Sequence, residues 1–153
     1  MSVFKYRMQN ILNMKTKLEE QAKIEFATAN RRVLEEQEKL SMLQNRKKAL
    51  EKRAKELLKA PSLDVQEIIL NRNGILKSQE DIKRQQKVLS KAEEVREEKR
   101  NKFMEERTDR KTHEILRENA FEEFMQEEKA AEGKEIDQLT SYTYGQKLTE
   151  NNE

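Results

Sequence analysis

The chain has 153 residues, of which 41% are charged and 34% hydrophobic, and it contains neither Trp nor Cys. This composition excludes a globular core of ordinary thickness, disulfides and thiolate metal sites, and no segment approaches the ~18 consecutive apolar residues of a membrane span. Strong helix formers dominate, and a disordered chain of this polarity usually contains more Pro, Gly and Ser, so the composition predicts an all-α coiled coil.

Apolar residues recur at steps of three and four along the first part of the chain, which is the heptad repeat of a left-handed coiled coil. The apolar positions are Phe4, Met8, Ile11, Leu18, Ala22, Phe26, Ala29, Val33, Leu40, Leu43, Leu50, Ala54 and Leu57. Three positions of the same repeat are polar, namely Lys15, Glu36 and Lys47. The pattern predicts a first helix over about residues 4–59.

The only proline, Pro61, predicts a tight turn at about residues 60–62. Proline removes a helical hydrogen bond and disfavours helical geometry in the residue before it. Ser62 is a suitable N-cap for the next helix, and Asp64 and Glu67 place negative charge in its first turn. We therefore expect a long antiparallel two-helix coiled-coil hairpin that forms a single domain over residues 1–140.

A second, longer helix is expected over about residues 63–139. Its apolar positions recur every seven residues at Ile68, Ile75, Ile82 and Leu89, and the expected polar positions beside them are Arg72, Gln79 and Gln86. Gly74 interrupts this pattern, and the sequence leaves open whether it breaks the helix. We expect Gly74→Ala to raise helicity if the helix is continuous, whereas a left-handed Gly74 would make the change destabilising. Residues 141–153 are expected to form a disordered, flexible tail.

Pairing of the two helices follows from a turn at Pro61. The expected contacts are Phe26 with Phe103, and Phe4 and Met8 with Phe121 and Phe124. Residues 1–60 contain 15 Lys/Arg and 8 Asp/Glu, whereas residues 115–153 contain 4 and 10, so this pairing also places opposite charges side by side. Both patterns favour a hairpin that is monomeric when isolated, with a parallel dimer as the alternative.

Catalytic chemistry has no candidate residues here. His113 is the only histidine, no partner set for nucleophilic or metal catalysis surrounds it, and no Gly-rich phosphate loop occurs. Glu51 and Glu56 interrupt the basic cluster before the turn, so we interpret that cluster as a solvated helix face rather than a nucleic-acid site. No enzymatic activity, cofactor, metal or nucleic acid is expected.

Both ends of the predicted hairpin carry apolar residues beyond those that one seam can bury. At the open end these are Phe4, Met8, Phe121, Phe124, Met125, Ile136 and Leu139; at the turn end they are Ile69, Leu70, Ile75 and Leu76. An apolar stripe rimmed by charge is typical of an interface, and a helix face docks in this way into a partner's groove. Ordinary coiled-coil core, or a short extra helix at the turn, is the alternative.

The chain opens with FKYRMQNILN (residues 4–13) and LEEQAK (residues 18–23), and EEKAAEGKEIDQL stands at residues 127–139. The first two stretches resemble the start of Gram-positive members of the flagellar FliJ family, and the third is similar to the acidic C-terminal signature of that family. The matching positions are Glu128, Glu132, Lys134 and Asp137, whereas Gly133 and Gln138 depart from the pattern. Gly74 and Ser78 stand where many members carry an aromatic residue and a Leu, with Ile75 and Leu76 adjacent.

The resemblance implies a soluble, non-enzymatic stalk and adaptor of the flagellar type III export apparatus. It implies insertion into the ring of the export ATPase FliI and contacts with the export gate protein FlhA and with export chaperones. The open end, including Glu128, Lys134 and Asp137, would then meet the ATPase, and the turn end would meet the gate. The implied location is the cytoplasm, with peripheral docking at the cell membrane and no direct insertion. A general coiled-coil scaffold, or the stalk of a non-flagellar type III system, remains the alternative.

Overall fold

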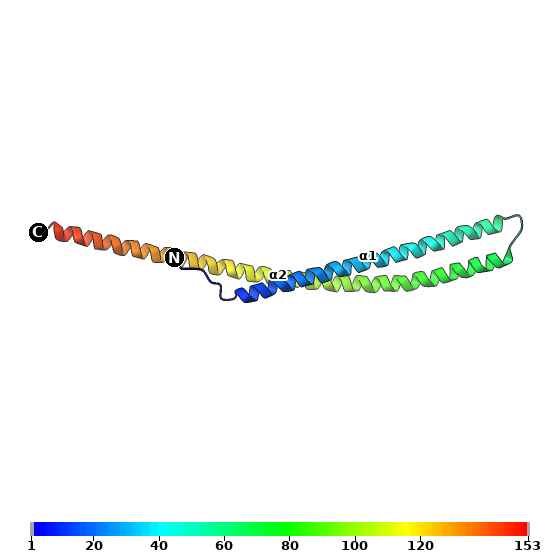
Figure 1. Cartoon of the computed structure of the whole chain (residues 1–153), viewed down its shortest axis with the longest axis horizontal. Coiled ribbons are helices and arrows are strands. Elements are labelled where there is room, and N and C mark those ends of the chain that lie inside the picture. The colour runs from blue at the N-terminus through cyan, green and yellow to red at the C-terminus, as the bar shows by residue number, and fades with distance from the viewer. Residues whose placement is uncertain (1, 153) are drawn as a thin grey trace. The chain divides into compact units, whose positions relative to one another are not determined.

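Two long α-helices make up the fold of this protein. The structure is a computed structural model that describes residues 2–152, so the first residue of the expected hairpin and the last of the expected tail, residues 1 and 153, lie outside the described residues. Helix α1 is Gln9–Lys59 and helix α2 is Val65–Glu150, and no strand occurs within residues 2–152 (Figure 1). The predicted all-α hairpin with a longer second helix is confirmed.

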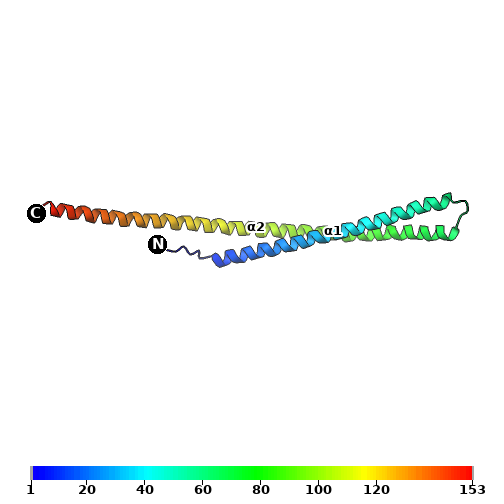
Figure 2. The same cartoon turned by 45° about the horizontal axis from the view of Figure 1, so that its top comes forward.

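The chain divides into two compact units, and each unit combines a segment of α1 with a segment of α2. Unit 1 is Met1–Glu19 with Glu106–Glu153, and unit 2 is Glu20–Glu105, which includes the turn. Pairing is antiparallel inside each unit. Cross-helix side-chain contacts are Gln9 with Arg117 and Glu19 with Arg110 in unit 1, and Glu25 with Lys99, Glu36 with Gln85 and Arg53 with Glu67 in unit 2. Within unit 2 the helices also lie side by side in the turned view of Figure 2.

Helix α1 begins at Gln9, so the predicted start at Phe4 was wrong. The backbone N–H of Gln9 donates to the carbonyl of Tyr6 over 3.1 Å, which is a turn and not yet a helix. The first helical turn has no acidic residue, and basic Lys5 and Arg7 precede it. Positive side chains beside the positive end of a helix dipole are unfavourable, which accounts for the late start. The predicted last residue, Lys59, is confirmed.

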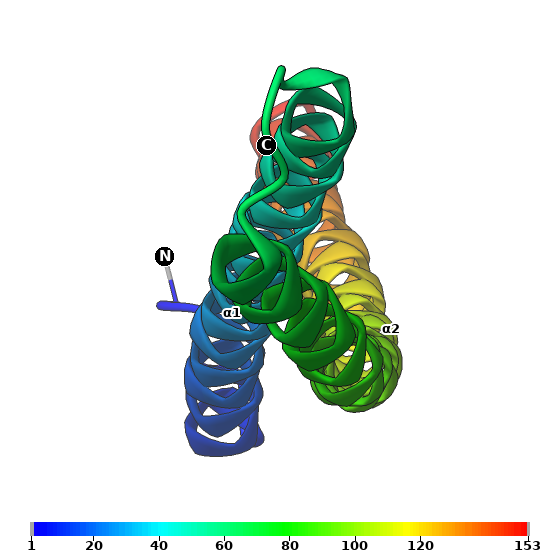
Figure 3. The same cartoon turned by 90° about the vertical axis from the view of Figure 1, so that its right-hand side faces the viewer.

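Asp64, and not Ser62 as predicted, caps helix α2. The Asp64 Oδ1 atom accepts the backbone N–H of Glu67 over 3.2 Å, and the Asp64 carbonyl accepts that of Ile68 over 3.1 Å. This is the bonding pattern of an N-cap residue, whose side chain satisfies a free N–H in the first turn. Helix α2 therefore begins at Val65, and the turn extends past the expected residues 60–62 (Figure 3).

Helix α2 continues to Glu150, so the predicted end near Leu139 and the disordered tail were wrong for residues 140–150. No proline occurs in this segment, and its threonine side chains satisfy their hydroxyls inside the helix. The hydroxyls of Thr140, Thr143 and Thr149 donate to the carbonyls of Ile136, Leu139 and Gly145 over 2.9, 2.8 and 3.3 Å.

From Ala22 to Leu57 every predicted seam position of α1 is buried or half-buried, whereas the predicted positions Met8 and Leu18 were wrong, because both side chains are exposed. The buried residues of α1 are Ala22, Ala29, Val33, Glu36 and Leu57, together with Leu12, which the repeat did not include. Glu36 is only 1% exposed, and its carboxylate accepts a hydrogen bond from Gln85 and lies 3.1 Å from Arg32 and 3.2 Å from Lys39. The hydrogen bond from Gln85 and the two cations lower the pKa of Glu36 below its ordinary value. The polar seam position thus holds a charged carboxylate.

The polar row of α2 was predicted one residue out of place. Arg72, Gln79 and Gln86 are exposed, and the residues that face α1 instead are Asn71, Ser78 and Gln85. Together with the apolar row at Ile68, Ile75 and Ile82 they alternate by three and four, as a coiled-coil seam requires. The Asn71 Nδ2 atom donates to the carbonyl of Leu50 over 3.0 Å, so this buried polar side chain is paired.

Candidate partner-binding surfaces

An aromatic cluster anchors the start of the chain in unit 1. The ring of Phe4 meets Phe121 edge-on, with centroids 5.1 Å apart, and lies 5.4 Å from Phe124. The guanidinium of Arg117 sits over the Phe4 ring, 5.7 Å from its centroid. These contacts confirm the expected meeting of Phe4 with Phe121 and Phe124. In unit 2 the other expected pair, Phe26 and Phe103, is stacked with centroids 6.2 Å apart.

Polar contacts hold the same region of unit 1 in register. Arg117 Nε donates to Gln9 Oε1 over 2.9 Å. Arg110 forms ion pairs with Glu19 and, over 2.7 Å, with Glu114. These two carboxylates raise the pKa of Arg110. The start of the chain is therefore tied to α2 by both rings and charges.

The candidate residues at the open end separate into packed and unpacked groups. Ser2 donates to Glu128, which is the contact farthest along α2 described between the two segments of unit 1. Met8, which was expected to meet Phe121 and Phe124, is 39% exposed, and Met125 is 40% exposed. From Lys129 to Glu150 every residue except Gly133 is exposed. This stretch of α2, residues 129–150, is called the overhang below.

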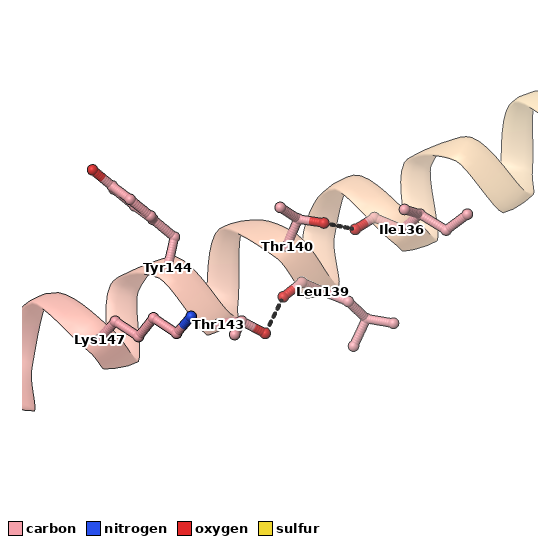
Figure 4. A pocket seen from close by; sticks show the side chains of 6 residues that line it. All are labelled: Ile136, Leu139, Thr140, Thr143, Tyr144 and Lys147. Atoms are coloured by element: carbon pink, nitrogen blue, oxygen red, sulfur yellow. Dashed lines mark hydrogen bonds between the residues drawn. The ribbon is translucent and has the colours of Figure 1, made fainter.

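The overhang carries an apolar stripe along one side. Ile136 and Leu139 are 62% and 66% exposed. They border a shallow depression of about 370 Å³, which is completed by Thr140, Thr143, Tyr144 and Lys147 (Figure 4). The predicted residues Lys134 and Asp137 are exposed on the same segment but do not line it. Tyr144 was missed because the helix was expected to end before it; the i+8 spacing from Ile136 would have indicated it.

At the turn end of unit 2, the four candidate residues do not share one surface. Ile75 and Leu76 line a groove of about 220 Å³. The other residues of this groove are Ala54, Leu57, Leu58, Ile68, Asn71 and Arg72. Ile69 and Leu70 are 52% and 70% exposed and lie outside it. Sequence reasoning missed Leu58, although an apolar residue directly after the seam residue Leu57 marks the flank of the seam.

Charge at the turn end is unevenly compensated. Arg53 pairs with Glu67 over 2.6 Å and with Glu56 over 3.5 Å, and the Glu67 carboxylate raises the pKa of Arg53. The Asp64 carboxylate is engaged in capping. The lysines of this end, which are Lys52, Lys55 and Lys59, are exposed, and none of them joins an ion pair with a residue of the described chain. Residues 52–72 contain five Lys/Arg and three Asp/Glu, so the net charge of the turn end is positive.

Neither surface has the geometry of a metal site. Within residues 2–152, no three His, Cys, Asp or Glu side chains are grouped to hold a metal ion. In the same part of the chain, no helix combines the length and the apolar character of a membrane span. The arrangement offers apolar surface with charged borders, which is the usual composition of a protein interface.

Comparison with known protein families matches the flagellar FliJ protein over residues 4–149. No curated protein and no solved structure matches the chain. The matched span includes the aromatic cluster, the turn with its groove and nearly all of the overhang, so the resemblance noted from residues 4–13, 18–23 and 127–139 is confirmed. This chain therefore belongs to the flagellar FliJ family, whose members are non-catalytic components of the flagellar protein export apparatus.

Proposed function

We propose that this protein is a non-enzymatic stalk and adaptor of the flagellar export apparatus. It inserts into the ring of the export ATPase FliI and connects that ring to the export gate protein FlhA and to export chaperones. Membership of the FliJ family supports a role in flagellar export. The observation that carries the finer assignment is the overhang, a long exposed helix with an apolar stripe and no covering segment of α1 among the described residues.

The overhang is suited to a partner with an apolar groove and a basic rim. Its stripe, at Ile136 and Leu139, offers apolar anchors at helical spacing. The acidic excess of this end lies mainly just before the overhang, since residues 115–128 contain 5 Asp/Glu and 1 Lys/Arg, whereas the overhang itself contains 4 and 3. Complementary charge steers partners toward each other and suppresses contacts with like-charged surfaces. We therefore assign this end to the ATPase.

The turn end is suited to a different partner, because its net charge is positive. Leu58 and Leu76, 67% and 50% exposed, are the most accessible apolar residues of the groove. Arg72 also lines the groove and is a cation that a partner's carboxylate can pair. We assign this groove to the export gate. Export chaperones are a further proposed partner class, supported by the family alone.

Binding to the ATPase tests the first assignment. Ile136→Ser with Leu139→Ser removes both anchors, and the variant should retain its helicity since both side chains are exposed. We expect at least a tenfold loss of affinity for FliI, on the order of 1.4 kcal/mol, from the loss of two buried anchors. Tyr142→Ser is the matched control, because Tyr142 is 66% exposed and lies outside the depression. Equal binding by both variants would contradict the assignment.

Gate binding tests the second assignment. Leu58→Ser with Leu76→Ser should weaken binding to FlhA and leave FliI binding unchanged. The control is Met42→Ser, whose side chain is 71% exposed on α1 and outside the groove. If each double variant lost the opposite partner, the two ends would be exchanged. A chain that left FliI turnover unchanged would instead be a plain scaffold, contrary to the proposal.

A further inference from the structure

Four large apolar residues at the turn end lie outside the groove described above. They are Leu63, Val65, Ile69 and Leu70, which are 59%, 63%, 52% and 70% exposed. None of them lines the groove that contains Leu58 and Leu76. Isolated exposed apolar residues need no explanation, but here four such residues occur within eight positions at a turn. We call these four residues the tip patch.

The tip patch is spread around the end of the helix pair and does not form one face. Val65 and Ile69 are one turn apart and share a side of α2, whereas Leu70 is rotated from Ile69 by about 100°. Leu63 lies in the turn itself, at the end seen face-on in Figure 3. A groove on a protein partner accepts one face of a helix. Apolar residues on several sides of a tip instead suit a continuous apolar phase that the tip enters end-on.

The charges around the tip patch favour an anionic surface. Residues 52–72 contain five Lys/Arg and three Asp/Glu, and of the acidic residues Glu56 and Glu67 pair with Arg53 while Asp64 caps α2. The exposed lysines in the last two turns of α1, Lys52, Lys55 and Lys59, have no such partner in the described chain. Lysines beside an apolar patch can extend their ammonium groups to lipid phosphates while their stems cover apolar surface.

We propose that the turn end docks on an anionic phospholipid surface. Leu63, Val65, Ile69 and Leu70 enter the boundary between headgroups and acyl chains, and the three lysines bind the phosphates. Water remains available at this depth, so the free carbonyls at the end of α1 and the turn backbone stay hydrated. The inference goes beyond the proposed function, because the groove at Leu58 and Leu76 stays open for the gate when the tip is docked.

Vesicle flotation tests the proposal with the full chain. We expect binding to vesicles of phosphatidylcholine with about one third phosphatidylglycerol, and none to phosphatidylcholine alone. Changing Lys52, Lys55 and Lys59 to Gln should weaken binding roughly fivefold per charge. Leu63→Ser with Leu70→Ser should abolish it, whereas the exposed mid-helix control Met42→Ser should bind as the unchanged chain does.

Tryptophan fluorescence measures insertion directly, because the chain contains no native Trp. Leu63→Trp should shift its emission to the blue with anionic vesicles and be quenched by lipids brominated near the headgroup, and Met42→Trp should show neither effect. Absence of the shift, or equal shifts at both positions, would overturn the proposal. The proposal would also be overturned if the chain does not bind vesicles and Leu63→Ser with Leu70→Ser abolishes gate binding, because the tip patch would then bind a protein. Leu58→Ser with Leu76→Ser should leave vesicle binding unchanged, which separates this test from the test of gate binding.

Discussion

Replacing Gly74 with alanine should have two opposing effects on stability, a gain in helix propensity and a close contact with a neighbouring side chain. Gly74 is helical, and no glycine of the described chain has a positive φ, so the break left open by the sequence is absent. Alanine is favoured over glycine inside a helix by about 1 kcal/mol. The new Cβ atom, however, would lie 3.3 Å from Leu50 Cδ1 and 3.8 Å from Leu50 Cδ2. The first distance is shorter than ordinary van der Waals contact, so Leu50 must move.

The cost of moving the Leu50 side chain decides whether Gly74→Ala stabilises or destabilises the protein. Leu50 is half-buried, and its carbonyl is held by Asn71. We take the cost of displacing its side chain as about 1–2 kcal/mol, the lower part of the range for an overpacked core. Gly74→Ala should therefore destabilise the protein by about 0–1 kcal/mol, contrary to the rise expected from helix propensity alone. In a Leu50→Ala background the obstacle is gone, and Gly74→Ala should stabilise by about 1 kcal/mol.

Urea unfolding of the four chains in this double-mutant cycle measures the coupling. Leu50→Ala alone should destabilise by about 2 kcal/mol, at the low end for a half-buried Leu. The expected coupling between the two positions is about 1–2 kcal/mol. A stabilisation of about 1 kcal/mol by Gly74→Ala in both backgrounds would refute the close contact. Gly133→Ala is the control, because nothing lies within 4 Å of its new Cβ; it should slow amide exchange in the overhang.

The cap, the seam and the buried carboxylate give three further predictions. Asp64→Ala should lower the free energy of unfolding by about 1 kcal/mol, whereas Ser62→Ala should change it by less than about 0.5, and the reverse result would restore the cap predicted from the sequence. Thermal unfolding should show that Leu57→Ala, at a site 6% exposed, destabilises by about 2–3 kcal/mol, while the adjacent Leu58→Ala stays within about 0.5. The pKa of Glu36 is lowered in the folded state, so the stability that its carboxylate contributes is complete above the ordinary value of 4.5 and is lost as the pH falls through the lower folded pKa. Urea unfolding should therefore show a smaller loss of stability below about pH 5 for Glu36→Gln than for the unchanged chain, and identical pH profiles would contradict this.

The sequence by itself determined the helices, the turn and their pairing. Glu, Lys, Leu and Ala leave the backbone little alternative to helix, and Pro61 interrupts it at one place. The rings of Phe26 and Phe103, and of Phe4 and Phe121, meet as predicted because an antiparallel turn leaves little freedom of register. The FliJ family was also evident from local stretches of residues, since such motifs survive without any knowledge of packing.

Only the tertiary structure decided which polar residues of α2 enter the seam. Asn71 and Arg72 are adjacent polar residues, and either one completes a repeat of three and four with the apolar row at Ile68 and Ile75. Periodicity alone therefore cannot decide which of the two faces α1. The choice depends on partners across the seam, such as the Leu50 carbonyl that Asn71 reaches. The start of α2 was also undecided from the sequence, because Asp64 and Ser62 were equally suitable caps, and the structure shows Asp64 bonded to the first turn.

The sequence predicted residues of the candidate surfaces but not how those residues are grouped in space. The sequence placed apolar residues at both ends, yet Ile69 and Ile75 could not be assigned to different surfaces without knowing how α2 is rotated against α1. That rotation also places Leu58 of α1 and Leu76 of α2 in the lining of one groove, a grouping that no spacing within one helix encodes. A linear pattern specifies the face of each helix, and the packing of the two helices decides which faces join into one groove.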